Sequence, residues 1–126
     1  MKPSIYIASK TKYANRWRCL REDGANIIAT WIDEAGPGET EDHADLAMRC
    51  IREPATADVT ILYIGMRDEI AKGSLIEVGA ALAAGKRVIQ VGECVNSVSV
   101  FQSHPLWSRA QTMGEAIVMA KREPTP

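Results

Sequence analysis

The chain has 126 residues, which is enough for one folded domain with a hydrophobic core and too few for two. Its net charge of −1 argues against a basic surface for a nucleic-acid polymer or an anionic membrane, although a pocket for a small nucleotide needs only local charge. No apolar run approaches the ~20 residues of a membrane-spanning helix, and the first residues do not resemble a signal peptide. We therefore expect a single cytoplasmic domain over 1–126, with a frayed tail at 122–126.

The cysteines and histidines do not form a recognisable metal or disulfide pattern. The three cysteines are odd in number and widely spaced, and the two histidines have no cysteine or acidic motif beside them. We interpret Cys19 and Cys50 as small core residues of helices. The sequence predicts no metal site and no cofactor.

Strand-like and helix-like segments alternate along the chain. Short β-branched or apolar runs predict strands at 5–8, 27–32, 59–64, 88–91 and 106–110. Apolar residues at helical spacing predict helices at 13–22, 40–53, 74–84 and 112–121, the second of which ends before Pro54. This alternation predicts an α/β fold with a parallel sheet covered by helices on both faces.

In such a sheet, ligands bind at the carboxyl ends of the strands, where the strand order reverses. Three loops should meet there, at 8–12, 33–38 and 65–73. The amino end of the helix that carries Glu77 belongs to the same crevice. Trp31 lies near the carboxyl end of the second predicted strand and Asp33 follows that strand. Both are candidates to meet a ligand, although a tryptophan is more often part of the core or its rim.

Glu77 is the one acidic residue of an otherwise apolar helix, and it has two interpretations. In the first, Ser74 and Glu77 form an S-x-x-E capping box. In the second, Glu77 is held ionised by the helix dipole and attacks the anomeric carbon of a sugar, as glycosidase carboxylates do. A second acid would then protonate the leaving group, and Asp58 and Asp68 are candidates for this role.

Three segments resemble the nucleoside 2-deoxyribosyltransferase family in order and spacing. They are Tyr6-Ile7-Ala8, Ala57-Asp58-Val59, and Lys72-Gly73-Ser74-Leu75-Ile76-Glu77-Val78-Gly79-x-Ala81 followed by Gly85-Lys86-x-Val88. The resemblance covers most of residues 4–92. It implies a flavodoxin-like or Rossmann-like three-layer sandwich, with a five-stranded parallel sheet in the order 2-1-3-4-5.

The same resemblance implies cleavage of the N-glycosidic bond of a 2′-deoxynucleoside or, in one branch, of its 5′-monophosphate. It implies that Glu77 is the nucleophile, that Tyr6 orients it, and that Asp58 lies near the base. It also implies a homo-oligomer in which a neighbour completes each site, and the segment 96–103 is a candidate contributor. The deoxyribosyl group would pass from Glu77 either to another base or to water.

A 5′-monophosphate needs an anion site. Ser9, Lys10, Thr11 and Lys12, with Arg16 behind them, combine hydroxyl groups and cations at a helix amino end, which suits a phosphate. The alternative is a solvated surface loop, and Ser97 and Ser99 are weaker candidates from a partner.

Two rival functions use the same crevice. One is a non-catalytic module that binds or senses a nucleotide. The other is an NAD-cleaving enzyme of the Toll/interleukin-receptor type, whose usual motifs are not visible.

Overall fold

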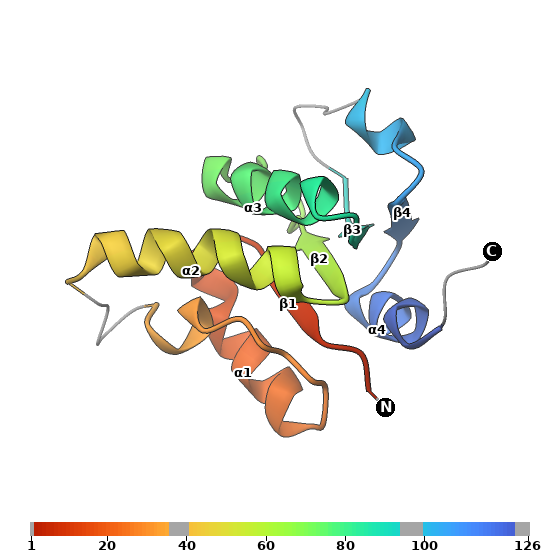
Figure 1. Cartoon of the computed structure of the whole chain (residues 1–126). Helices are drawn as coiled ribbons and strands as arrows, with labels where there is room; N and C mark the ends of the chain where they lie inside the picture. The colour runs from red at the N-terminus through yellow and green to blue at the C-terminus, as the bar shows by residue number, and fades with distance from the viewer. Residues whose placement is uncertain (1, 36–40, 94–99, 123–126) are drawn as a thin grey trace.

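A computed structural model describes residues 2–35, 41–93 and 100–122 of the chain. The strands β1 (Ile5–Ala8), β2 (Val59–Tyr63), β3 (Arg87–Val91) and β4 (Trp107–Ala110) form one parallel sheet in the order β1-β2-β3-β4 (Figure 1). The α-helices are α1 (Ala14–Glu22), α2 (His43–Thr56), α3 (Lys72–Ala83) and α4 (Met113–Lys121). Short 3₁₀ helices are η1 (Thr11–Tyr13), η2 (Trp31–Asp33) and η3 (Phe101–Ser103). The expected α/β architecture is confirmed.

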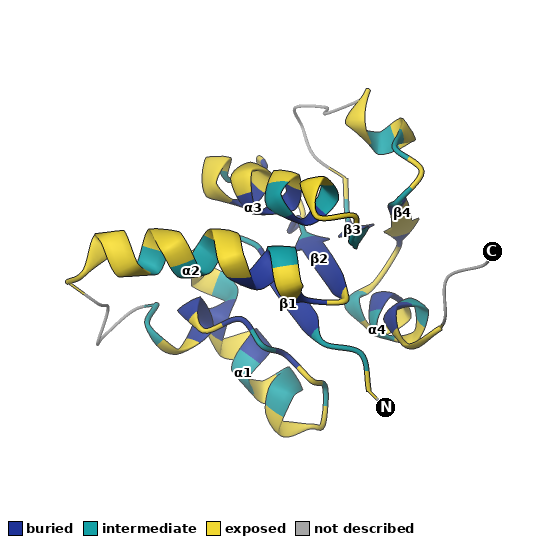
Figure 2. Ribbon diagram, in the orientation of Figure 1, coloured by how far each residue is buried: buried dark blue, intermediate teal, exposed yellow. Residues whose placement is uncertain are grey.

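The helices cover both faces of the sheet. α2 and α3 lie together on one face, and α1 and α4 lie on the other (Figure 1). Arg87 of β3 donates to the carbonyls of Met119 and Ala120 and so fastens the end of α4 to the sheet, at 3.3 and 3.0 Å. The strands β1 and β2 and most of β3 are buried while the outer sides of the helices are exposed (Figure 2), as expected for a parallel sheet between helix layers. The edge strand β4 exposes Ser108 and Arg109.

The expected second strand at 27–32 is not a strand, so the described sheet has four strands and not five. Only one parallel bridge remains of it, between Ile27 and Ile5 on the free edge of β1. Three residues later, side chains take over the hydrogen bonds: the Thr30 N–H binds a Glu53 oxygen at 2.9 Å, and the Trp31 indole donates to the Ile7 carbonyl at 2.8 Å. The backbone then turns into η2 instead of continuing the ladder.

The helix boundaries differ from the predictions in two places. α2 continues through Pro54 to Thr56, because proline removes only its own N–H bond and the next turn still closes, with the Ala57 N–H on the Glu53 carbonyl at 2.9 Å. α3 begins at Lys72, and its N-cap residue is Ala71. Ser74 therefore lies inside the first turn and caps nothing, so the capping box is wrong.

The predicted end of α3 is confirmed. Gly85 has a φ of +75°, and the Gly85 and Lys86 N–H groups bind the carbonyls of Leu82 and Ala81 at 3.0 and 2.9 Å. This is a Schellman motif, which glycine favours. It turns the chain directly from α3 into β3. None of the helices in the described ranges is long and apolar enough to cross a membrane.

Candidate active site

A cavity of about 490 Å³ opens where β1 and β2 end, between η1, η2, α2 and α3. Eight residues that the sequence singled out line it: Ser9, Lys10, Thr11, Lys12, Trp31, Gly73, Ser74 and Glu77. The remaining lining residues are Leu46, Cys50 and Ala71. Residues that are far apart in the sequence therefore meet at the expected end of the sheet.

Glu77 lies in the second turn of α3 and is only 8% exposed. Burial raises the pKa of its carboxyl group from 4.5 to about 8; the neighbouring Tyr6 hydroxyl acts against this rise, and the negative charge of Glu53 adds a smaller contribution to it. Among the described residues, its Oε2 atom has no hydrogen-bond partner. The helix dipole was expected to keep this group ionised, but Glu77 lies beyond the first turn, where that effect fades and loss of solvent dominates.

Tyr6 lies beneath Glu77, in the middle of β1. Its side chain is fully buried, and its hydroxyl has no hydrogen-bond partner within the described part of the chain. Burial first, and then the neighbouring Glu77 and Cys50, raise the pKa of the phenol. Tyr6 therefore stays neutral and keeps a proton that it can donate to an ionised Glu77.

Cys50 is a site residue that the sequence interpretation missed. It lines the cavity from α2, one turn after Leu46. Burial and the charge of Glu77 raise the pKa of the thiol, so it remains protonated at neutral pH. Its position on the apolar stripe of α2 was visible in the sequence, but that stripe does not show which of its members reaches a cavity.

The loop after β1 forms the opposite wall of the cavity. The Ser9 hydroxyl accepts a hydrogen bond from the Trp17 indole at 2.8 Å, which fixes where this loop leaves the sheet. Lys10 and Lys12 follow, and both side chains are substantially exposed. The wall thus presents two cations at the mouth of the cavity.

Asp68 does not line the cavity but forms ion pairs with the two lysines of this wall. Its Oδ1 lies 3.2 Å from the Lys12 ammonium and 3.8 Å from that of Lys10, and its Oδ2 accepts a hydrogen bond from the Tyr13 hydroxyl. The bond from Tyr13, followed by the bond from Lys12, lowers the pKa of Asp68. Asp68 is therefore a counter-ion of the lysines, placed to compete with any anionic ligand.

Three candidate residues are not brought to the cavity. Asp58 lies at the amino end of β2, where it accepts a bond from the Ser4 N–H at 2.8 Å. Asp33 is bound by both terminal nitrogens of Arg21, at 2.9 and 2.7 Å. Arg16 binds the Tyr63 hydroxyl at 3.1 Å, on the other face of the sheet. Ser97 and Ser99 lie outside the described residues.

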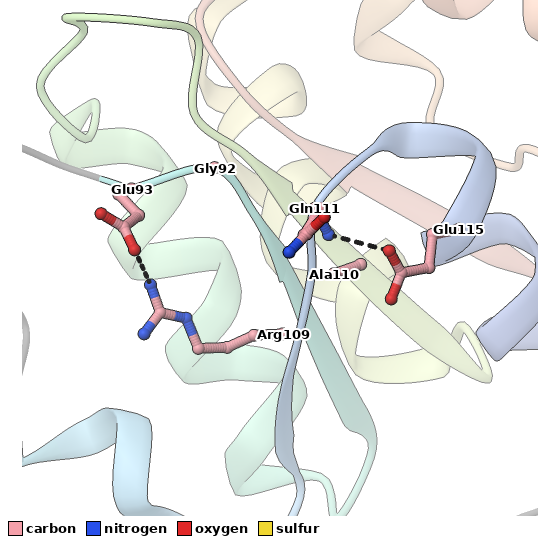
Figure 3. A pocket seen from close by; sticks show the side chains of 6 residues that line it. All are labelled: Gly92, Glu93, Arg109, Ala110, Gln111 and Glu115. Carbon is pink, nitrogen blue, oxygen red and sulfur yellow. Dashed lines mark hydrogen bonds and ion pairs between the residues drawn. The ribbon is translucent and has the colours of Figure 1, made fainter.

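A second, larger cavity of about 670 Å³ lies at the carboxyl ends of β3 and β4 (Figure 3). Its polar groups bind one another: Arg109 pairs with Glu93 at 3.3 Å, and Glu115 accepts from the Gln111 N–H at 3.2 Å. It contains none of the predicted residues and no buried polar atom without a partner. Glu77 therefore makes the smaller cavity the better candidate site. In the described ranges, no cluster of three His, Cys, Asp or Glu side chains is suited to hold a metal ion.

No protein-family model and no curated protein sequence matches the chain. Two solved structures are similar to it over nearly their whole length. A 2-deoxyribosyltransferase from Bacillus psychrosaccharolyticus has a TM-score of 0.65 and 17% sequence identity, over 98% of this chain and 99% of that chain. The CMP N-glycosidase of Clostridium botulinum has a TM-score of 0.56 and 15% identity, over 92% of this chain and 96% of that chain. The chain therefore shares its fold with a deoxyribosyltransferase and with a nucleotide N-glycosidase.

Proposed function

We propose that the chain cleaves the N-glycosidic bond of a 2′-deoxynucleoside or its 5′-monophosphate, with Glu77 as the nucleophile. The observation that carries the proposal is the buried Glu77 carboxyl group, which faces a cavity with one oxygen unpartnered in the described structure. A carboxylate buried without a partner is costly, so its retention at a cavity favours a chemical role. At about 490 Å³ the cavity also falls within the usual range for small-molecule sites.

The proposed reaction has two displacements. In the first, an oxygen of ionised Glu77 bonds to C1′ while the C1′–N bond breaks, and the electron pair leaves with the base, which takes a proton from water. In the second, water or another base attacks C1′, the ester bond to Glu77 breaks, and the attacking group loses a proton. Because Asp58 lies at the other end of the sheet, we assign it no role in protonating the base.

The charge state of Glu77 sets the pH dependence of the first step. Since its pKa is raised to about 8, most free molecules carry a protonated, unreactive Glu77 at pH 7. We expect kcat/KM to rise with pH and to level off above the pKa of Glu77. We propose that the neighbouring Tyr6 hydroxyl donates to the ionised carboxylate and holds it in one rotamer.

The two lysines at the mouth support a 5′-monophosphate as the preferred substrate. Lys10 and Lys12 are cations on the wall of the same cavity, and a phosphate would replace Asp68 as their partner. We also propose, from the resemblance of the sequence, that the chain forms a homo-oligomer in which a neighbouring copy completes the site.

One observation favours a second candidate function. A carboxyl group that is mostly protonated at pH 7 is a hydrogen-bond donor, which would suit a non-catalytic module that binds a nucleotide. Incubating the protein with deoxynucleosides, their 5′-monophosphates and CMP, with and without an acceptor base, separates the candidates. Free base without an acceptor indicates a hydrolase and exchanged base a transferase. Binding without either product, across pH 6 to 9, would refute catalysis.

Glu77→Gln is the matched variant for this assay. Gln has nearly the same shape but cannot form the ester, so we expect base release to fall by at least about a thousandfold. Equal activity of the variant and the unmodified protein would refute Glu77 as the nucleophile.

A further inference from the structure

The described part of the chain contains a second buried carboxylate, Glu53, which lies on α2 and is 9% exposed. Buried glutamates normally have a cationic partner. None of the ion pairs formed by the described residues includes Glu53. The cation one turn earlier, Arg49, pairs with Glu34 and Asp45 and reaches Glu53 only through the Thr30 hydroxyl, to which it donates at 2.6 Å. A direct ion pair therefore does not explain why Glu53 is buried.

Both oxygens of Glu53 are used to hold one residue, Thr30. Oε1 accepts from the Thr30 N–H at 2.9 Å, and Oε2 accepts from the Thr30 hydroxyl at 2.8 Å. Thr30 immediately precedes Trp31, which lines the Glu77 cavity and is itself bound to the Ile7 carbonyl. The carboxylate of Glu53 therefore fixes the first residue of the turn that forms one wall of the cavity.

Glu53 and Glu77 lie on neighbouring helices, because α2 packs against α3. Glu53 comes one helical turn after Cys50, which lines the Glu77 cavity from α2. Titratable groups around Glu77 come from β1, from α2 and from the loop across the cavity; they are Tyr6, Cys50, Glu53, Lys10 and Lys12. The negative charge of Glu53 contributes to the raised pKa of Glu77, after the larger effect of burial.

We propose that Glu53 is a positioning residue of the active site, which fixes the Thr30–Trp31 wall and places a fixed negative charge near Glu77. The inference rests on the function proposed above. In the first displacement, the charge of Glu77 is lost when its oxygen forms a neutral ester with C1′. A like charge nearby makes the ionised carboxylate less stable than the ester, and so favours the attack.

The test compares Glu53→Gln with the unmodified protein. Gln keeps an oxygen for the Thr30 N–H but removes the charge, so the wall is retained. We expect kcat to fall about tenfold and KM to stay within about twofold. The rise of kcat/KM with pH should move to lower pH by about one unit, because the carboxylate of Glu77 becomes easier to form.

Two further variants separate charge from structure. Thr30→Ala removes one of the two bonds to Glu53, and it should raise KM while leaving the pH profile in place. Asp45→Asn removes a charge from an exposed position of the same helix, and it should change neither quantity. An unchanged pH profile and kcat in Glu53→Gln would overturn the proposal.

A titration of Glu77 that needs no turnover tests this inference separately from the proposed function. The carboxyl ¹³C signal of Glu77, assigned by its loss in Glu77→Gln, can be titrated in the ligand-free protein. We expect a lower titration midpoint in Glu53→Gln than in the unmodified protein, whether or not any substrate is cleaved. An equal midpoint would refute the charge effect of Glu53. If Glu53→Gln does not fold, the same titration in Glu53→Asp should keep the raised midpoint, and a fall to the ordinary value would refute the inference.

Discussion

Glu77 has little exposure to water, a neutral phenol beneath it and an unpartnered oxygen in the described structure. Burial and the unpartnered oxygen make its negative charge costly in the free protein, whereas the Tyr6 hydroxyl reduces that cost. In the proposed reaction, this scarcity of partners leaves an ionised Glu77 few competing hydrogen bonds. A residue placed in this way lowers stability in exchange for reactivity, which is common at active sites.

The free energy lost by burying an ionised Glu77 should appear as a fall in folding stability as the pH rises. The folded protein keeps its proton up to about pH 8, whereas the ordinary pKa is 4.5. Raising the pH between these values therefore favours the unfolded chain, which releases this proton first. Glu77→Gln removes the effect, and we expect it to melt about 4 °C or more above the unmodified protein at pH 9, and to differ less at pH 5. Calorimetry at the two pH values checks this, and a constant difference would contradict it.

The lysines at the mouth should discriminate between substrates. Replacing Lys10 and Lys12 by Ala removes both cations from the cavity wall. We expect the KM for a 5′-monophosphate to rise about tenfold, and the KM for the corresponding nucleoside to stay within about twofold. Steady-state kinetics with both substrates measures this. Arg16→Ala is the control, because Arg16 binds Tyr63 and not the cavity. Equal effects on both substrates would show that the lysines do not recognise phosphate.

At the scale of single residues, the sequence predicts where a side chain lies in the fold better than it predicts how buried or how protonated that side chain is. Glu77 could be chosen because it is the one acid in an apolar helix, and its presence at the cavity is as expected. Its protonation could not be predicted, because burial depends on how α2 and Tyr6 pack around it. Asp58 was misplaced although its strand was identified, because an acid before a parallel strand lies at the amino edge of the sheet, away from the ligand.

At the scale of elements, the site depends on helices and strands that begin and end at defined residues. α3 starts at the cavity, and its Schellman motif at Gly85 returns the chain to β3. β3 then ends at Val91, and the next residue, Gly92, has a φ of +89° and lies against the Ile64 carbonyl. Both glycines adopt backbone conformations that other residues rarely adopt.

The two glycines should differ in how much stability is lost when each is replaced by alanine. A Cβ at Gly85 meets open space, so Gly85→Ala should lower the free energy of unfolding by only about 1 kcal/mol, the strain of the left-handed conformation. A Cβ at Gly92 would collide with the Ile64 carbonyl oxygen as well, so Gly92→Ala should cost clearly more. Urea unfolding of both variants tests the order. A loss in Gly92→Ala no larger than in Gly85→Ala would contradict the structure.

The sequence identified most elements because their apolar period and their breakers agree. The four strands of the described sheet and the ends of α3 and α4 follow from such local signals. The strand predicted at 27–32 does not form, because the side chains of Glu53 and Trp31 take over its hydrogen bonds. The β-branched residues of the segment do not reveal these contacts. α2 passes through Pro54 because the buried proline packs against the core, a tertiary effect that no local signal shows.

At the scale of the whole molecule, the cavity exists because a parallel sheet brings the carboxyl ends of β1 and β2 to one edge, and α2 and α3 then pack across it. The strand–helix alternation predicts this general location. It does not predict that a second hollow, near Arg109, is larger. Volume alone would therefore select the other cavity, whereas the buried carboxyl group favours the one at Glu77.

Apolar side chains on α3 and beside it remain exposed in the single chain. Ile76 is 62% exposed and Phe101 63% exposed. If the proposed homo-oligomer forms over this surface, sedimentation should give a mass above that of one chain, and Phe101→Glu should shift it toward the monomer. Lys121→Glu, on α4, serves as the control. A monomer at all concentrations would refute the oligomer.

The central claim is that Glu77 becomes covalently linked to the sugar. The protein is mixed with a 2′-deoxynucleoside 5′-monophosphate at pH 8, without an acceptor base, and quenched in acid within milliseconds. Peptide mass mapping should then find one deoxyribosyl phosphate group on the peptide that contains Glu77, and none in Glu77→Gln. Base release at full rate with the sugar on another side chain, or undiminished release by Glu77→Gln, would contradict the claim.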